Sequence, residues 1–90
     1  MSAPVVTMYT TGWCPYCTRA RALLEGKGIS WTEIDLEAEP MRRAEMHSRS
    51  GGLRSVPQIF VGDRHIGGAD ELAELERRGE LDALLGLRTG

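Results

Sequence analysis

The chain of 90 residues lacks the features that mark membrane, secreted or nucleic-acid-binding proteins. No apolar run approaches the ~20 residues needed to cross a bilayer, and residues 1–4 carry no basic group of the kind that opens a signal peptide. Acidic and basic residues are mixed and give a net charge of −2, which lends no support to a nucleic-acid partner. Without any linker or repeat, we expect one domain over residues 1–90, in a reducing cytoplasm and acting as a monomer.

Cysteine is equally scarce, since the chain contains only Cys14 and Cys17, two residues apart. A disulfide that closes so small a loop removes little entropy from the unfolded chain, so it would stabilise the fold poorly. It suits redox chemistry better, because the second thiol stays within reach of any adduct on the first. A zinc site needs about four ligands, and only His47 and His65 remain, at a spacing that fits no ordinary zinc module. We therefore expect a redox-active dithiol and no metal.

The pattern of apolar and turn-forming residues predicts short, closely spaced elements. Strands are predicted over residues 4–9, 29–36, 57–61 and 64–66, and helices over 15–26, 40–48 and 70–78, with a last helical turn near 81–85. The order β-α-β-α-β-β-α begins with a right-handed parallel crossover and adds an antiparallel hairpin at Gly62-Asp63. This order predicts an α/β fold, a four-stranded mixed sheet with helices on both faces.

Four separated motifs resemble those of the glutaredoxins. They are Cys14-Pro15-Tyr16-Cys17, Ser55-Val56-Pro57-Gln58-Ile59-Phe60, Gly62-Asp63 and Gly67-Gly68-Ala69-Asp70-Glu71-Leu72. The resemblance covers the chain from Val5 to about Leu85 and is similar to the small bacterial dithiol members of the glutaredoxin 3 type. It implies a thioredoxin fold and an enzyme that uses glutathione as co-substrate to reduce protein disulfides and glutathione mixed disulfides.

The two cysteines are expected to play different parts in this chemistry. Cys14 lies where the first predicted helix begins, and the helix N–H groups and dipole favour its thiolate. We therefore expect Cys14 to be the nucleophile that attacks a substrate disulfide. Cys17 lies one turn inside the helix, where it is more covered, and is expected to be the less acidic, resolving thiol.

The resemblance also implies where glutathione binds. Val56 is expected to pair its backbone with the cysteinyl part of glutathione, in the manner of an added strand, and Pro57 to be cis as in the family. Gly68, Ala69 and Asp70 match the segment that holds the γ-glutamyl end, with backbone N–H groups for its carboxylate and the Asp70 side chain for its ammonium.

Three further positions complete the implied glutathione site. Tyr16 is expected to form a wall of the groove near the sulfur, and Ser55 stands where the family usually has threonine. Arg43 is the best positional match for the group that meets the glycyl carboxylate, although Arg42 or Arg54 could serve instead.

The residues just before Cys14 depart from the family pattern, which commonly has a lysine there where this chain has Thr11-Gly12-Trp13. We expect weaker thiolate stabilisation or weaker glutathione affinity unless an arginine compensates. Trp13 either lines the groove or covers the end of the helix. Arg19 and Arg21 are interpreted as a solvated helix face.

Two other functions remain open on the sequence. One is a redoxin recycled by thioredoxin reductase, against which the Pro-Tyr pair and Gly67-Gly68-Ala69-Asp70 argue. The other is a carrier of a [2Fe–2S] cluster held between two chains by Cys14 of each and two glutathione molecules. A proline after the nucleophile generally disfavours such a cluster.

Overall fold

A computed structural model describes residues 4–87, and the ends of the predicted domain, residues 1–3 and 88–90, lie outside them. The strands are β1 (Val6–Thr10), β2 (Thr32–Asp35), β3 (Gln58–Val61) and β4 (Arg64–Gly67). The helices are α1 (Pro15–Gly26), η1 (Pro40–Arg42), α2 (Arg43–Arg49), α3 (Ala69–Arg77) and α4 (Leu81–Leu84). The sheet order is β2-β1-β3-β4, with β1 parallel to β2 and antiparallel to β3, and β3 antiparallel to β4. The predicted mixed α/β sheet is confirmed.

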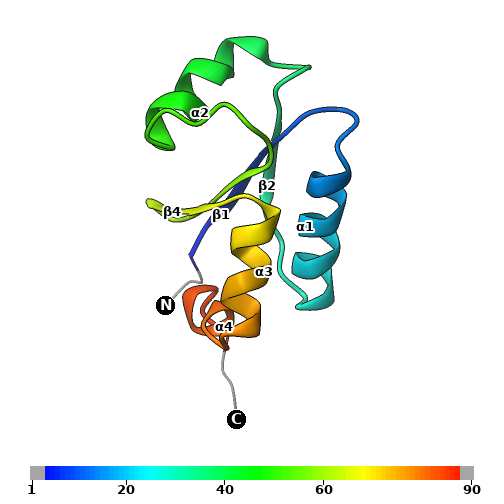
Figure 1. Cartoon of the computed structure of the whole chain (residues 1–90), viewed down its shortest axis with the longest axis vertical. Coiled ribbons are helices and arrows are strands. Elements are labelled where there is room, and N and C mark those ends of the chain that lie inside the picture. The colour runs from blue at the N-terminus through cyan, green and yellow to red at the C-terminus, as the bar shows by residue number, and fades with distance from the viewer. Residues whose placement is uncertain (1–3, 88–90) are drawn as a thin grey trace.

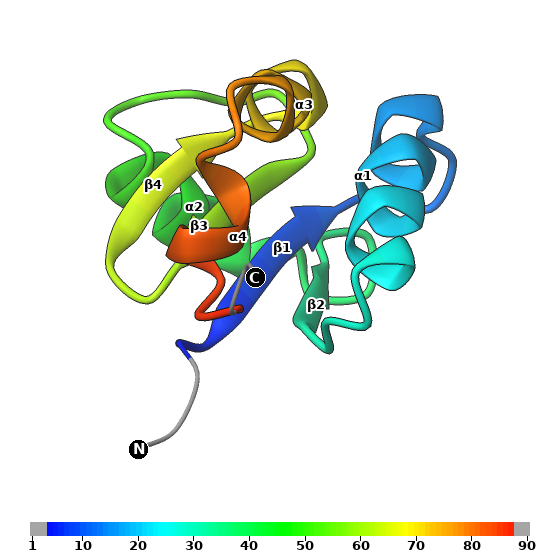
Figure 2. The same ribbon diagram turned by 90° about the horizontal axis from the view of Figure 1, so that it is seen from below.

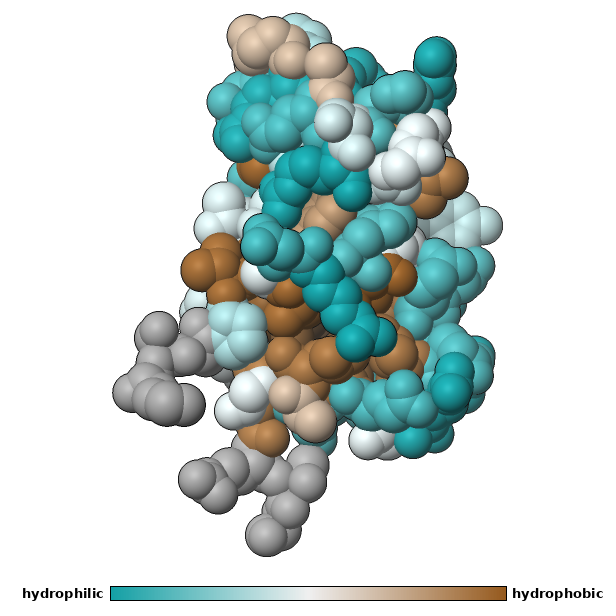
Figure 3. Space-filling model, turned by 90° about the vertical axis from the view of Figure 1, so that its left-hand side faces the viewer, coloured by the Kyte–Doolittle hydropathy of each residue, from teal (hydrophilic) through white to brown (hydrophobic). Residues whose placement is uncertain are grey.

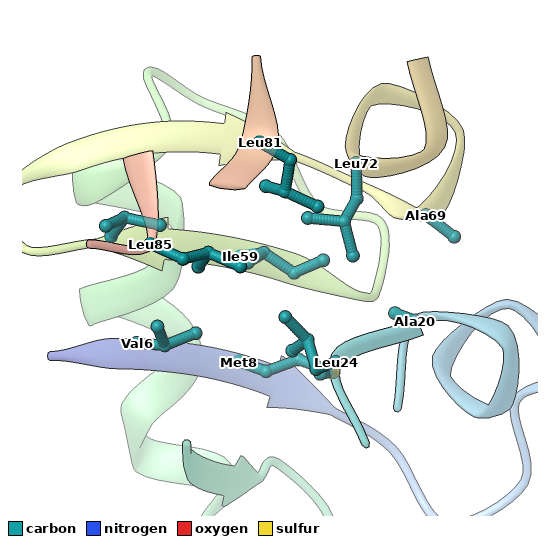
Figure 4. Packing of buried hydrophobic residues seen from close by; sticks show 10 residues of the cluster. Val6, Met8, Ala20, Leu24, Ile59, Ala69, Leu72, Leu81 and Leu85 are labelled. Atoms are coloured by element: carbon teal, nitrogen blue, oxygen red, sulfur yellow. The ribbon is translucent and has the colours of Figure 1, made fainter. Parts of the chain in front are cut away.

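The first and larger core lies between one face of the sheet and the helices α1, α3 and α4 (Figures 1 and 2). Met8 and Ile59 from the two central strands meet Leu24 of α1, Leu72 of α3 and Leu81 of α4, and all five side chains are fully buried (Figure 4). Burying each such side chain contributes roughly 1.5–3 kcal/mol. This core fixes α1 and α3 side by side, so both helices begin at the same end of the fold (Figure 1).

A second core lies on the opposite face of the sheet, under α2. Met46 of α2 packs there with Tyr9 and Phe60 of the central strands, and with Ile34 and Leu36 at and just beyond β2. The Tyr9 hydroxyl donates a hydrogen bond to Glu45 and accepts one from Arg49, at 2.9 Å. Because α2 lies on this face of the sheet and α1, α3 and α4 lie on the other, the prediction of helices on both faces is confirmed. On the side of the molecule that carries α2 and β4, the surface is mainly hydrophilic at the end with α2, and apolar side chains are exposed nearer the termini (Figure 3).

Two predicted elements are shorter than expected. The strand predicted over residues 29–36 is regular only over Thr32–Asp35, while Ile29 and Trp31 pack against the first core from the preceding loop. The helix predicted from Pro40 begins with the 3-10 turn η1, and its α-helical part starts at Arg43. Met41 lies in this 3-10 turn and is 72% exposed.

Candidate active site

Cys14 lies at the N-cap of α1, as the sequence predicts. Its backbone is extended, and Pro15 follows as the first helical residue. The Cys14 Sγ accepts a hydrogen bond from the backbone N–H of Cys17 at 3.2 Å. A donor of this kind, at the positive end of a helix, stabilises a thiolate. Cys14 is half-buried, so its sulfur remains within reach of a substrate.

Cys17 occupies a different environment, one turn inside α1, where it is fully buried. Burial raises the pKa of Cys17 to about 12, and the hydrogen bond and charge of Cys14 act in the same direction. A backbone hydrogen bond from Thr11 and the charge of Arg21 oppose this increase. The expected contrast between an accessible thiol and a covered one is therefore present in the structure.

The loop before β3 brings the backbone of Val56 beside the nucleophile candidate. The Val56–Pro57 peptide bond is cis, as expected. The Cys14 thiol donates to the Val56 carbonyl oxygen, with 3.8 Å between Sγ and O. Behind the loop, the buried Gln58 donates from Nε2 to the Ser55 carbonyl oxygen at 3.1 Å and to the Ser55 hydroxyl at 3.2 Å. The loop is thus held in place by a buried amide.

A groove of about 490 Å3 extends from this loop to the start of α3. Seven of the eight residues predicted to bind glutathione line this groove: Tyr16, Ser55, Val56, Pro57, Gly68, Ala69 and Asp70. The groove is also lined by six residues that the sequence did not identify as part of the site: Leu53, Gln58, His65, Ile66, Gly67 and Glu71. The His65 ring contacts Gln58 Oε1 at 2.6 Å and stacks on Phe60. Gln58, Gly67 and Glu71 belong to the quoted motifs and the other three lie within two residues of one, which is the signal that could have found them.

The start of α3 forms the far end of the groove and departs from the expectation in one detail. The N–H of Gly68 is already taken, because Glu71 Oε1 accepts from it at 2.6 Å. The N–H groups of Ala69 and Asp70, in the first turn, have no acceptor within the helix. Two of the three expected donors are therefore available to an anion. Glu71 is the third residue after the N-cap Gly68 and therefore caps the start of α3.

Charges at this end of the groove come from Asp70 and Arg19. The two side chains are exposed and lie 3.7 Å apart, and the Arg19 guanidinium also lies over the Tyr16 ring, 5.7 Å from its centroid. The Asp70 carboxylate therefore faces the groove with a cation beside it. Arg19 is solvated as expected, whereas Arg21 is not, because it pairs with Glu33 at 2.6 Å.

Arg43 is the one predicted glutathione residue that does not line this groove. It borders a separate hollow of about 280 Å3 together with His47 and Arg54. Arg54 directly precedes Ser55, so the same loop borders both depressions. Within residues 4–87, no carboxylate lies within ion-pair distance of Arg43 or Arg54, whereas Arg42 pairs with Glu45 at 2.9 Å.

The loop before Cys14 is held by a carboxylate. Glu37 Oε1 accepts a hydrogen bond from the Gly12 N–H at 2.6 Å, and a Cβ at Gly12 would collide with the same oxygen. Trp13 is 86% exposed and does not line the groove, so the first of its two expected placements is not observed.

Comparison with known proteins assigns this arrangement to a family. The family model described as glutaredoxin matches residues 6–66 of the chain. The chain belongs to the glutaredoxin family. It is 52% identical to a glutaredoxin of Pseudomonas aeruginosa, over 91% of this chain and 96% of that protein. It is 50% identical to glutaredoxin 3 of Escherichia coli, over 89% of this chain and 95% of that protein.

A solved structure confirms the thioredoxin fold of this glutaredoxin. The buckwheat glutaredoxin–glutathione complex superposes with a TM-score of 0.84 at 31% identity, and the match covers 93% of this chain and 77% of that chain. The protein is a dithiol, glutathione-dependent thiol–disulfide oxidoreductase with Cys14 and Cys17 as its C-x-x-C pair.

Over residues 4–87, no helix is long and apolar enough to span a bilayer. In the same range, no three or more His, Cys, Asp or Glu side chains gather as the ligands of a metal ion.

Proposed function

We propose that this glutaredoxin reduces both protein disulfides and glutathione mixed disulfides, with Cys14 as the nucleophile and Cys17 as the resolving thiol. The observation that carries this order is the contrast between the two sulfurs. Cys14 Sγ is accessible and accepts the N–H of Cys17, whereas Cys17 is buried and its pKa is raised to about 12, mainly by burial. Because thiolates attack disulfides, the accessible sulfur at the helix start attacks first.

In the proposed cycle, the Cys14 thiolate attacks a substrate disulfide, forms a mixed disulfide and expels one substrate thiolate. With a protein substrate, Cys17 then attacks Cys14 Sγ, releases the reduced protein and leaves the Cys14–Cys17 disulfide. One glutathione reopens that disulfide as an adduct on Cys14, and a second releases Cys14 as a thiolate, forming oxidised glutathione. A glutathionylated substrate needs only Cys14.

We place glutathione in the groove between Tyr16, the cis-proline loop and the start of α3. The Val56 backbone lies beside Cys14 Sγ, where it suits the cysteinyl peptide group. The N–H groups of Ala69 and Asp70 suit the γ-glutamyl carboxylate, and the Asp70 side chain suits its ammonium. This assignment is supported by the seven predicted residues that share the groove.

The glycyl carboxylate of glutathione is assigned to Arg43, with Arg54 as its neighbour. Both guanidinium groups border the hollow that adjoins the same loop, and neither has a carboxylate partner among residues 4–87. Their positive charges would replace that of the lysine which the family commonly has just before the nucleophile, where this chain has Thr11-Gly12-Trp13. Disulfide-containing and glutathionylated proteins are the proposed partners, and a reducing cytoplasm is the proposed compartment.

A coupled assay tests the proposal. Cys14→Ser is expected to abolish all activity, while Cys17→Ser loses protein-disulfide reduction and keeps deglutathionylation. Turnover is expected to need glutathione and glutathione reductase. If Cys14→Ser retained activity and Cys17→Ser lost both activities, the order of the thiols would be reversed. Sustained turnover with thioredoxin reductase alone would favour the alternative recycling route.

A further inference from the structure

The ion pair of Arg21 and Glu33 has its arginine one helical turn beyond the buried thiol of Cys17, and the proposed cycle gives the pair no part. Arg21 follows Cys17 by four residues on α1, so both side chains emerge on the same side of the helix. Arg21 Nε donates to both Glu33 oxygens, at 2.9 and 3.1 Å, and Arg21 Nη2 donates to Oε2 at 2.6 Å. The side chains are 29% and 31% exposed, so the pair is partly shielded from solvent.

Glu33 is itself fixed from two further positions. Thr10 Oγ1 and Trp31 Nε1 each donate a hydrogen bond to its carboxylate at 3.1 Å. Thr10 is the buried last residue of β1 and leads directly to Thr11, whose backbone hydrogen-bonds Cys17. Through these hydrogen bonds the Glu33 carboxylate connects β2 to β1 and to α1, the helix that carries both cysteines. A guanidinium fixed in this way keeps its charge at a defined place, unlike an arginine that is free in solvent.

We propose that Arg21, held by Glu33, is a positioning residue for the resolving step, favouring the Cys17 thiolate as it forms and so speeding release of the reduced substrate. This inference rests on the proposed order of the two thiols. In the step, Cys17 loses its proton to solvent, and its sulfur forms a bond to Cys14 Sγ. The bond between Cys14 and the substrate sulfur breaks, and its electron pair leaves with the substrate thiolate. The two cysteines are oxidised and the substrate sulfur is reduced.

The electrostatic environment of Cys17 is consistent with this proposed role of Arg21. Burial dominates the raised pKa of Cys17, and the hydrogen bond and charge of Cys14 add to it. Once Cys14 is tied up in a mixed disulfide, its thiolate charge is gone, while Arg21 remains and acts in the opposite direction. The charge of Arg21 therefore acts at the resolving step without the opposing charge of Cys14.

The size of the effect follows from two opposing changes. A neighbouring charge of this kind changes a thiolate population by about tenfold. Without the cation the Cys17 thiolate would also be more basic and therefore a better nucleophile. With a Brønsted coefficient of about 0.4–0.5, this raises the rate constant for attack by the thiolate about threefold and offsets part of the lost population. Loss of the cation is therefore expected to slow the resolving step at neutral pH by about threefold.

Stopped-flow reaction of the reduced protein with dithiobis(nitrobenzoate) separates the two steps, because each releases a coloured thiolate. The first phase reports attack by Cys14 and the second reports attack by Cys17. Arg21→Gln is expected to slow the second phase about threefold, to shift its pH profile toward higher pH and to slow the first phase less, because Arg21 interacts more strongly with Cys17 than with Cys14. Arg21→Lys is expected to restore most of the second-phase rate. Arg78→Gln, which removes an exposed arginine of the α3 end, is the matched control and is expected to change neither phase.

Three outcomes would contradict part of this account, and each is distinct. An unchanged second phase in Arg21→Gln overturns the inference and leaves the proposed order of thiols intact. Equal slowing of both phases shows only a structural role for Arg21 and also overturns it. Loss of the fast first phase in Cys17→Ser contradicts the proposed order itself, because Cys14 would then not be the attacking thiol.

Discussion

Replacement of Glu33 by Gln is expected to lower the free energy of unfolding at neutral pH by about 1–2 kcal/mol. The pKa of Glu33 is lowered from 4.5 to about 2, mainly by its hydrogen bonds with Arg21. Desolvation raises this pKa, and the hydrogen bonds from Trp31 and Thr10 lower it further. The difference of about 2.5 corresponds to at most about 3.4 kcal/mol, at about 1.36 kcal/mol per pKa unit. Because both partners are about 30% exposed, solvent screening reduces this figure.

The pH dependence of this loss follows from the sign of the pKa change. A carboxyl whose pKa is lower in the folded state stabilises the fold above its unfolded value, and the stabilisation fades as the pH falls from about 4.5 to about 2. Urea denaturation of both proteins across this range measures the difference. Glu80→Gln, at an exposed pair with Arg78, is the control and is expected to change stability little. A difference between wild type and Glu33→Gln that is equal at pH 2 and pH 7 would refute the reasoning.

Three further predictions concern the thiols, the glycyl carboxylate and the core. At pH 7 a thiol with a pKa of about 12 is ionised in roughly one molecule in 100,000, so iodoacetamide is expected to label Cys14 and spare Cys17. Comparable labelling of both in peptide mapping would contradict this. Arg43→Gln is expected to raise the KM for glutathione about two- to fivefold with kcat unchanged, as for the loss of an exposed ion pair, whereas an unchanged KM would remove Arg43 from the site. Leu72→Ala is expected to cost about 2–5 kcal/mol in chemical denaturation, because Leu72 is fully buried in the first core. A loss below 1 kcal/mol would mean that α3 packs less tightly than described.

Most of the fold could be predicted from the sequence because local signals agree with it. Pro15 begins α1, Gly62-Asp63 turns the hairpin and Gly79, in a left-handed conformation, follows α3. The errors lie where local pattern and tertiary packing differ. The sequence pattern at Ile29 and Trp31 predicts a strand, yet both residues lie in a loop and pack against the first core. Their placement depends on tertiary packing, which the local sequence does not show.

The candidate site was predictable where a backbone motif carries it, and less so where long side chains meet. The segments around Val56 and Ala69 are predicted through the proline- and glycine-containing motifs that resemble those of the glutaredoxins. Arg21 was interpreted as a solvated residue, because nothing in its own segment shows that Glu33 lies opposite. Glu37, which holds the Gly12 N–H, is 25 residues away in sequence, and its contact depends on the crossover between β1 and β2.

The most direct measurement of the central claim is the intact mass of Cys17→Ser and Cys14→Ser after brief exposure to oxidised glutathione at neutral pH. The account predicts rapid formation of one glutathione adduct on Cys14 in the first variant and almost none on Cys17 in the second. Equally rapid formation of an adduct on Cys17 would contradict it.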